Sequence, residues 1–210
     1  PNGGGKSTLA KIIAGIYRPN AGKIYLDGKD ITDLDITGRA KAGIGFAFQQ
    51  PVRFKGLTVR DLLELSAGKK LAAEDTCALL GKVGLCAEEY IDREMSAALS
   101  GGEAKRIEIA TVLARNAKLS VFDEPEAGID LWSFARLVET FEDIRSSTSG
   151  SLVIISHQER ILSIADEIVV VADGKIRTSG KREDILPLLL KGEFSGRCPA
   201  AAPQNGGGCK

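Results

Sequence analysis

The stretch PNGGGKST, at Pro1–Thr8, decides the fold because it matches most of a phosphate-binding loop. Such a loop has the pattern G-x-x-x-x-G-K-[ST], and Gly5, Lys6 and Ser7 occupy its last three positions. The glycines let backbone N–H groups approach a phosphate, the lysine bridges the β and γ phosphates, and the hydroxyl binds Mg²⁺. Apolar residues at helical spacing follow, so we predict a helix over Ser7–Tyr17 whose N-terminus points at a nucleotide.

The sequence starts inside this loop. Residue 1 is a proline, so we expect the leading glycine and the strand that feeds the loop to lie upstream of the chain as written. A flexible glycine-rich terminus is the alternative, but the helical pattern at the correct offset favours a phosphate site. The loop residues expected to contact the nucleotide are Asn2, Gly3, Gly4, Gly5, Lys6, Ser7 and Thr8.

The stretch LSVFDEP, at Leu119–Pro125, is an apolar strand that ends in two carboxylates. Asp123 is predicted to hold Mg²⁺ through a water, on the same ion as Ser7. Glu124 is predicted to orient and deprotonate the water that attacks the terminal phosphate. An acidic pair at a strand end is unremarkable alone, but downstream of a phosphate loop it indicates the metal side of a nucleotide site.

The stretch LSGGE, at Leu99–Glu103, directly precedes a helix predicted over Glu103–Asn116. Ser100, Gly101 and Gly102 would present a hydroxyl, exposed N–H groups and the positive end of a helix dipole to an anion. The same residues also form an ordinary serine N-cap. The position between a phosphate loop and a strand ending in Asp-Glu favours the anion-binding interpretation.

Two further polar residues follow predicted strands. Gln49, in the stretch FQQP, stands at the end of a strand over Gly43–Gln49. His157, the only histidine of the chain, directly follows the apolar strand Ser151–Ser156. Because α/β sheets bind ligands beyond the carboxyl ends of their strands, we expect His157 to face the ligand.

The rest of the chain alternates strands with helices, which predicts parallel pairing and an α/β core. Between Gln49 and Leu99, a capping box of Thr58 and Asp61 opens one helix and an amphipathic segment over Ala72–Leu85 forms a second, so we expect a small helical subdomain there. The other predicted elements are a hairpin turning at Asp27-Gly28, helices Leu131–Ser146 and Arg182–Leu190, and strands Glu167–Ala172 and Lys175–Gly180.

Composition excludes several classes of protein. Among 210 residues, Lys+Arg and Asp+Glu both total 28, which argues against an electrostatic hold on nucleic acid. The apolar runs are too short to cross a bilayer. The four cysteines form no C-x-x-C pair, which fits a reducing cytoplasm, and Cys198 and Cys209 fit no common metal-ligand spacing. Residues 197–210 are expected to be a disordered tail.

The ordered set of motifs resembles the ATP-binding cassette (ABC) ATPase family, from Pro1 to about Leu190. The resemblance implies an α/β P-loop NTPase core with a parallel sheet and an inserted helical subdomain at about 52–100. It also implies a single domain over 1–196 that binds ATP and Mg²⁺ and hydrolyses ATP. The expected catalytic residues are Glu124, His157, Lys6 and Gln49, and the expected metal ligands are Ser7, Gln49 and Asp123.

The family also assigns roles to particular positions. LSGGE is its signature motif, so Ser100, Gly101, Gly102 and Glu103 are expected to close on the nucleotide of a partner cassette in a head-to-tail dimer. Gln49 corresponds to the Q-loop glutamine that contacts Mg²⁺. Asp130 in AGID corresponds to the D-loop aspartate, and His157 to the switch histidine that contacts the γ-phosphate.

A narrower resemblance is to SufC, the cytosolic cassette ATPase of iron–sulfur cluster assembly, which implies SufB/SufD-like scaffold partners. It rests on AFQQPVRFKGLT, LSGGEAKRIEIA, EPEAGID and SHQERIL; two departures are a shorter segment between Gln49 and Ser100 and Pro125-Glu126 in place of Ser-Asp. The alternative is the nucleotide-binding subunit of a membrane transporter, cytoplasmic but peripheral to the membrane. A nucleic-acid-associated cassette is disfavoured by the neutral charge balance, and a kinase would leave LSGGE unexplained.

Overall fold

The structure, a computed structural model, describes residues 3–96, 98–147 and 150–192, and these form parts of two compact units. One unit contains Lys6–Ile164, and the other contains Pro1–Gly5 with Ala165–Lys210. The predictions for Asn2, for Cys198 and Cys209 and for the tail over 197–210 lie outside the described residues. Within the described residues, no helix combines the length and the apolar character that a membrane crossing requires.

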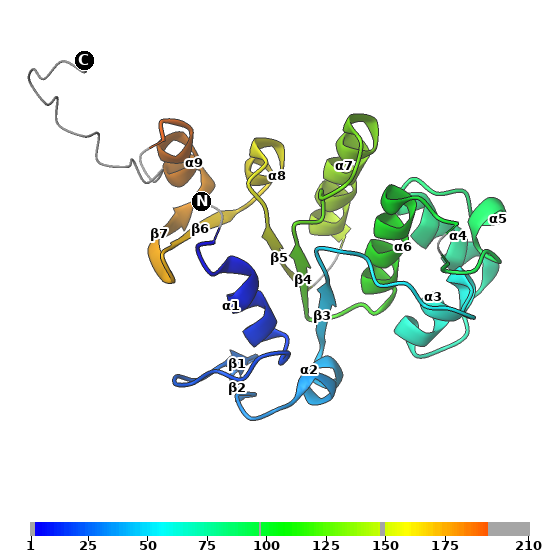
Figure 1. The fold of residues 1–210 in the computed structure, drawn as a ribbon, viewed down its shortest axis with the longest axis horizontal. Coiled ribbons are helices and arrows are strands. Elements are labelled where there is room, and N and C mark those ends of the chain that lie inside the picture. Colours follow the sequence, from blue (N-terminus) through cyan, green and yellow to red (C-terminus); the bar gives the residue numbers. More distant parts are fainter. Residues whose placement is uncertain (1–2, 97, 148–149, 193–210) are drawn as a thin grey trace, which may run out of the picture. The chain divides into compact units, whose positions relative to one another are not determined.

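The larger unit is built on a three-stranded sheet whose strands are parallel, as predicted. Its strands are β3 (Ile44–Ala47), β4 (Leu119–Asp123) and β5 (Ser151–Ile155), hydrogen-bonded in that order (Figure 1). Strand β4 is buried over most of its length, which explains its continuous apolar character. Because all three strands run the same way, their carboxyl ends meet at one edge of the sheet.

Helices pack around this sheet and extend the unit. Helix α1 (Lys6–Ile13) contacts β4, and α6 (Gly101–Ala114) contacts β3, while α3, α4 and α5 gather beside α6 (Figure 1). The remaining elements are β1 (Tyr25–Leu26), β2 (Lys29–Asp30), α2 (Ile36–Ala42), α3 (Val59–Ala67), α4 (Ala73–Lys82), α5 (Ala87–Tyr90), α7 (Leu131–Ser147) and α8 (Glu159–Ser163).

Most predicted elements are present within a few residues of their expected bounds. The capping box of Thr58 and Asp61 is confirmed, since each side chain bonds the other residue's backbone N–H. The β1–β2 hairpin also turns at Asp27-Gly28 as predicted. The helices α2, α5 and α8 were not predicted; each has at most seven residues and little apolar periodicity.

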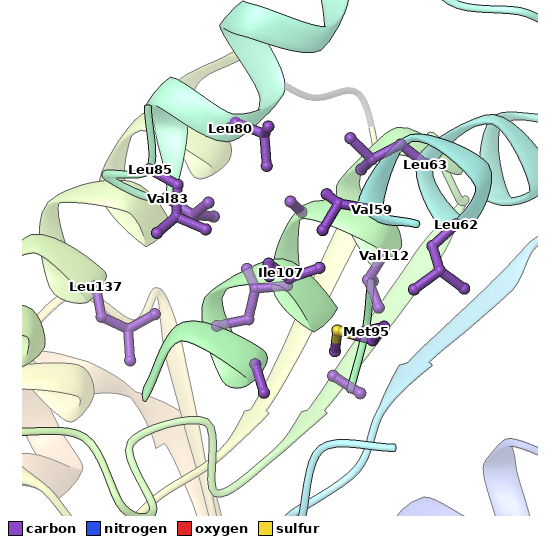
Figure 2. Packing of buried hydrophobic residues seen from close by; sticks show 14 of the residues in the cluster. Val59, Leu62, Leu63, Leu80, Val83, Leu85, Met95, Ile107, Val112 and Leu137 are labelled. Atoms are coloured by element: carbon purple, nitrogen blue, oxygen red, sulfur yellow. The ribbon is translucent and has the colours of Figure 1, made fainter. Parts of the chain in front are cut away.

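A large apolar core joins the helices between β3 and β4 to the sheet. The side chains of Val59, Leu63, Leu80 and Ile107 are fully buried where α3, α4 and α6 meet (Figure 2). The same cluster continues through Phe122 of β4. Burial at this level stabilises the unit by about 1.5–3 kcal/mol for each large apolar side chain, so the start of α6 is anchored to the sheet by packing.

Arg39 of α2 is a buried charge that closes the C-terminal end of α1. Only 1% of this residue is exposed, and its guanidinium donates to the carbonyl oxygens of Ile12 at 2.6 Å, Ile13 at 2.8 Å, Thr32 at 2.8 Å and Leu34 at 3.2 Å. Burial lowers the pKa of Arg39, but the four acceptors compensate the cation. The helix that presents Lys6 and Ser7 at its other end is therefore held by an arginine from outside it.

We predict that Arg39→Met destabilises the protein by about 2–4 kcal/mol, because helix-end carbonyls lose their donors inside the core. This corresponds to a fall in Tm of about 5–15 °C for a chain of this size, measurable by thermal denaturation. Arg115→Met is the matched control, since Arg115 donates to the Ala40 carbonyl from an exposed position. An equal fall in Tm for the two variants would contradict the role of Arg39 in holding the end of α1.

The smaller unit contains an antiparallel hairpin followed by a helix. Strands β6 (Glu167–Ala172) and β7 (Lys175–Lys181) turn at Asp173-Gly174, and α9 spans Arg182–Leu190, all as predicted (Figure 1). Gly4 lies against this hairpin: its carbonyl accepts from Gly174 N at 3.1 Å. A Cβ on Gly4 would approach the Val171 carbonyl oxygen to 2.6 Å, so only glycine fits there.

Candidate active site

Ser7 and Asp123, predicted to share a metal ion, lie in direct contact. Ser7 is the second residue of α1, and Asp123 is the last residue of β4. The Ser7 hydroxyl donates to Asp123 Oδ1 at 2.9 Å, and Asp123 is only 2% exposed. The fold therefore brings a hydroxyl and a buried carboxylate together at the carboxyl edge of the sheet, although 116 positions separate them in the sequence.

Glu124 has a backbone conformation that few residues adopt. Its φ is +46°, in the left-handed region, and its N–H donates to the Ile155 carbonyl oxygen of β5 at 3.0 Å. A residue in this region costs of order 1–3 kcal/mol unless its surroundings hold it. The conformation turns the chain at the end of β4, where the carboxylate meets residues from the two neighbouring strands.

Gln49 and His157 both approach the Glu124 carboxylate. The Gln49 side-chain amide donates to Glu124 Oε2 at 2.6 Å, and His157 Nδ1 lies 3.8 Å from Glu124 Oε1. Each residue follows the end of its strand, β3 for Gln49 and β5 for His157. Two of the four predicted catalytic side chains thus lie around the carboxylate of a third, Glu124, whose side chain is 18% exposed.

The other residues predicted to contact the nucleotide lie in α1, in the segment before it and directly before α7. Lys6 begins α1 and is partly buried, and Thr8 is exposed on the same helix. The predicted loop glycines Gly3, Gly4 and Gly5 belong to the smaller unit and continue in sequence directly into Lys6. Asp130 precedes α7, where its carboxylate accepts from Ser133 N at 3.0 Å.

The signature residues form a reciprocal cap at the start of α6. The Ser100 hydroxyl accepts from Glu103 N at 3.2 Å, and Glu103 Oε2 accepts from Ser100 N at 2.7 Å. The Tyr90 hydroxyl donates to Glu103 Oε1 at 2.5 Å. These bonds, that of Tyr90 above all, lower the pKa of Glu103 to about 2. Glu103 therefore already uses both carboxylate oxygens to hold the helix end.

Packing at the start of α6 does not require glycine at positions 101 and 102. A Cβ built on either glycine would meet nothing within 4 Å in the part of the chain that the structure describes. Ser100 and Gly101 are exposed. Hydrogen bonding and packing within this unit thus account for Ser100 and Glu103, but not for the two glycines between them.

Three polar residues next to the site were not predicted from the sequence. Glu126 Oε1 accepts from the hydroxyl of Ser156 at 2.5 Å, directly before His157, while Glu126 Oε2 is buried with no partner among the described residues. Lys105 and Glu108 of α6 are buried and contact the backbone beside Gln49. Glu108 stands in an apolar helical pattern and could have been noticed as a charge on a buried helix face.

Comparison with known proteins shows the family to which this chain belongs. The model of the ABC transporter family matches residues 1–127, more than half of the chain. An ABC transporter ATP-binding protein of Methanocaldococcus jannaschii, MJ0035, is 37% identical over 215 residues, covering 97% of this chain and 83% of that protein. The lipopolysaccharide export ATP-binding protein LptB of Haemophilus influenzae is 34% identical over 192 residues, covering 89% and 78%.

Solved structures show the same fold. The cassette MJ0796, described as a dimer in a post-hydrolysis state bound to ADP and Pi, superimposes with a TM-score of 0.76 at 25% identity, covering 87% of this chain and 82% of that one. A bacterial Atm1-family ABC exporter with ATP bound gives 0.76 at 26% identity, covering 89% of this chain and 34% of that one. The chain described here therefore belongs to the ABC transporter ATP-binding family, with a P-loop NTPase fold and ATPase activity.

Proposed function

We propose that this chain is the nucleotide-binding subunit of an ABC membrane transporter and that it hydrolyses Mg-ATP in a head-to-tail pair of cassettes. The observation that carries the enzymatic part is the gathering of Gln49 and His157 on Glu124, next to the Ser7–Asp123 contact. The named relatives carry the transporter part. The subunit would act at the cytoplasmic face of a membrane.

The residues at the end of β4 fit Mg²⁺. Mg²⁺ prefers oxygen ligands and is usually bound by one or two carboxylates together with waters and substrate phosphates. Ser7 and Asp123 supply a hydroxyl and a carboxylate in contact, and no cluster of three acidic, cysteine or histidine side chains occurs among residues 3–96, 98–147 and 150–192. Ser7, Asp123 and Gln49 would hold the ion, which supplies charge neutralisation at the β and γ phosphates.

Each remaining site residue has a role in hydrolysis of the terminal phosphate. Glu124 accepts a proton from the attacking water and orients it, while Gln49 fixes the position of that carboxylate. His157 donates a hydrogen bond to the γ-phosphate, and the Lys6 ammonium binds the β and γ oxygens. Backbone N–H groups at the start of α1, with Thr8, would contact the phosphates.

A second cassette would complete each site. The N-terminus of α6 presents Ser100 and Gly101 to solvent, with Gly102 half-buried beside them, and no packing within the described part of their unit requires the glycines. A helix N-terminus without bulky side chains suits the γ-phosphate of ATP bound to a partner cassette. Glu103 would position Ser100, and Asp130 would face the partner's phosphate loop. The cassette MJ0796, which was solved as a dimer, supports the pairing of two cassettes.

An apolar hollow beside Gln49 suits the transporter partner. It has a volume of about 330 Å³ and includes Phe48, directly before Gln49, and the exposed side chains of Val52, Phe54 and Leu65. We propose that a cytoplasmic helix of the membrane subunit inserts apolar side chains there, so that its movement reaches Gln49. Relatives support this partner class: LptB, and EcfA1 of Mesomycoplasma hyopneumoniae, named as an energy-coupling factor transporter protein, at 36% identity over 191 residues.

The comparisons favour the transporter role over the SufC-like role, because the relatives named here are ATP-binding proteins of transporters and not of iron–sulfur cluster assembly. The SufC-like role still has the sequence resemblance to support it, in the runs AFQQPVRFKGLT, LSGGEAKRIEIA, EPEAGID and SHQERIL.

Purification of the tagged full-length protein from its own cells, in mild detergent, tests the transporter proposal. We expect a multi-span membrane protein to co-purify and to depend on Phe54, so that Phe54→Asp releases it while ATP hydrolysis by the isolated subunit is retained. Recovery of soluble scaffold proteins in place of a membrane protein would favour the SufC-like role.

A further inference from the structure

Lys105 and Glu108, one turn apart on α6, hold both backbone polar groups of Phe48. The ammonium of Lys105 donates to the Phe48 carbonyl oxygen and, at 3.1 Å, to Glu108 Oε2; the Gln49 carbonyl oxygen lies 3.5 Å away. Glu108 Oε1 accepts from Phe48 N at 2.9 Å. Lys105 is 0% exposed and Glu108 is 9% exposed. The two buried side chains of this ion pair thus contact one peptide segment from both sides.

The contacts of Lys105 and Glu108 with Phe48 lie directly beyond the end of strand β3. Strand β3 pairs with β4 only as far as Ala47 opposite Phe122, so Phe48 is the first residue beyond the ladder. Its N–H and carbonyl would otherwise need new partners at the edge of the core. Because side chains of α6 supply these partners, the backbone at Phe48 is hydrogen-bonded to α6 and not to the sheet. The side chain of the next residue, Gln49, donates to Glu124 Oε2 at 2.6 Å.

A buried ion pair is a costly way to fill this space. Burial raises the pKa of Glu108 and the Lys105 charge opposes that rise. Apolar residues of similar volume at both positions would often be as stable. The pair is better explained by what it contacts, since α6 is capped by the exposed Ser100 and reaches the backbone of Phe48 through Lys105 and Glu108.

We propose that Lys105 and Glu108 are positioning residues for hydrolysis, which hold Gln49 against Glu124 and fix it to α6, the helix that Ser100 caps. This inference rests on the proposed ATPase mechanism. A cassette that engages Ser100 would then set the Gln49–Glu124 contact through a rigid helix, without touching either residue.

Steady-state hydrolysis by the full-length protein, as a double-mutant cycle with Gln49→Ala, tests the proposal. We expect Lys105→Met to lower kcat about tenfold, with KM for ATP changed less than about twofold, because Lys6 for the phosphates and the Ser7–Asp123 contact for the ion are unaffected. In the Gln49→Ala background, Lys105→Met should cause little further loss, since both act through one contact. Glu108→Gln, which keeps an acceptor for Phe48 N–H, should lose less.

Controls separate positioning from folding and from the proposed function. Thr140→Val removes another buried bond of the same unit, to the Lys82 carbonyl, and should lower Tm while leaving kcat unchanged. Lys105→Met/Glu108→Gln avoids an unpaired buried carboxylate if the single variant unfolds. The NMR signal of the Gln49 side-chain amide should shift in Lys105→Met, a readout that does not need turnover.

If Lys105→Met lowered kcat by the same factor in the wild type and in Gln49→Ala, the positioning role would be overturned. An unchanged NMR signal of the Gln49 side-chain amide would overturn it too, and in both cases hydrolysis by the wild type would be unaffected. A wild-type protein with no ATPase activity would instead remove the mechanism on which this inference rests.

Discussion

Replacing Glu124 with glutamine should lower the rate of ATP hydrolysis by a factor of about 10²–10⁴, the usual contribution of a general base. The amide has nearly the same shape but cannot accept the proton of the attacking water at neutral pH. Gln49 and His157 would still surround the side chain, and Ser7 and Asp123 are untouched. Binding of ATP should therefore persist, and the ATP-bound dimer should accumulate because it is not hydrolysed.

Two measurements on the full-length protein check this expectation. Single-turnover hydrolysis gives the chemical step, and gel filtration with Mg-ATP gives the fraction of dimer, which should rise in Glu124→Gln over the wild type. Glu139→Gln, the same change on an exposed part of α7, is the control and should behave as the wild type. Undiminished hydrolysis by Glu124→Gln would show that another group activates the water.

Much of this site could be predicted because its residues follow strands. Gln49, Asp123 and His157 each stand at or just beyond the end of a parallel strand, and parallel strands end at a shared edge. Their meeting therefore follows from the alternation of strands and helices. The cap of α6 is equally local, since the bonds between Ser100 and Glu103 depend on a spacing of three residues.

What could not be predicted depends on contacts between distant segments. Arg39 and Lys105 have ordinary positions in their own helices, and only the folded chain brings them to carbonyl groups elsewhere. The left-handed backbone at Glu124 is equally invisible, because no turn residue such as glycine announces it. The class of partner protein could not be predicted from the motifs either. The SufC-like runs suggested scaffold proteins, whereas the relatives indicate a transporter.

Gly101→Asp should abolish most ATP hydrolysis, by about a hundredfold or more, without destabilising the fold. A side chain at Gly101 meets nothing within 4 Å, and a carboxylate in the first turn of a helix stabilises it by about 0.3–1 kcal/mol. Tm should therefore be unchanged or slightly raised. A partner cassette, however, would bring a triphosphate to this helix end and meet an anion where it needs donors.

Mixing variants identifies the loss as one that acts between cassettes. Lys6→Ala disables the phosphate loop of its own chain, and Gly101→Asp disables the helix end offered to the partner, so each variant alone should be inactive. A mixed dimer retains one site with both parts intact, and the mixture should hydrolyse ATP faster than either variant. Gly81→Asp, at an exposed helical glycine with equally open surroundings, should remain active. If mixing restores nothing while ATP still binds to Gly101→Asp, the two cassettes do not share their sites head to tail.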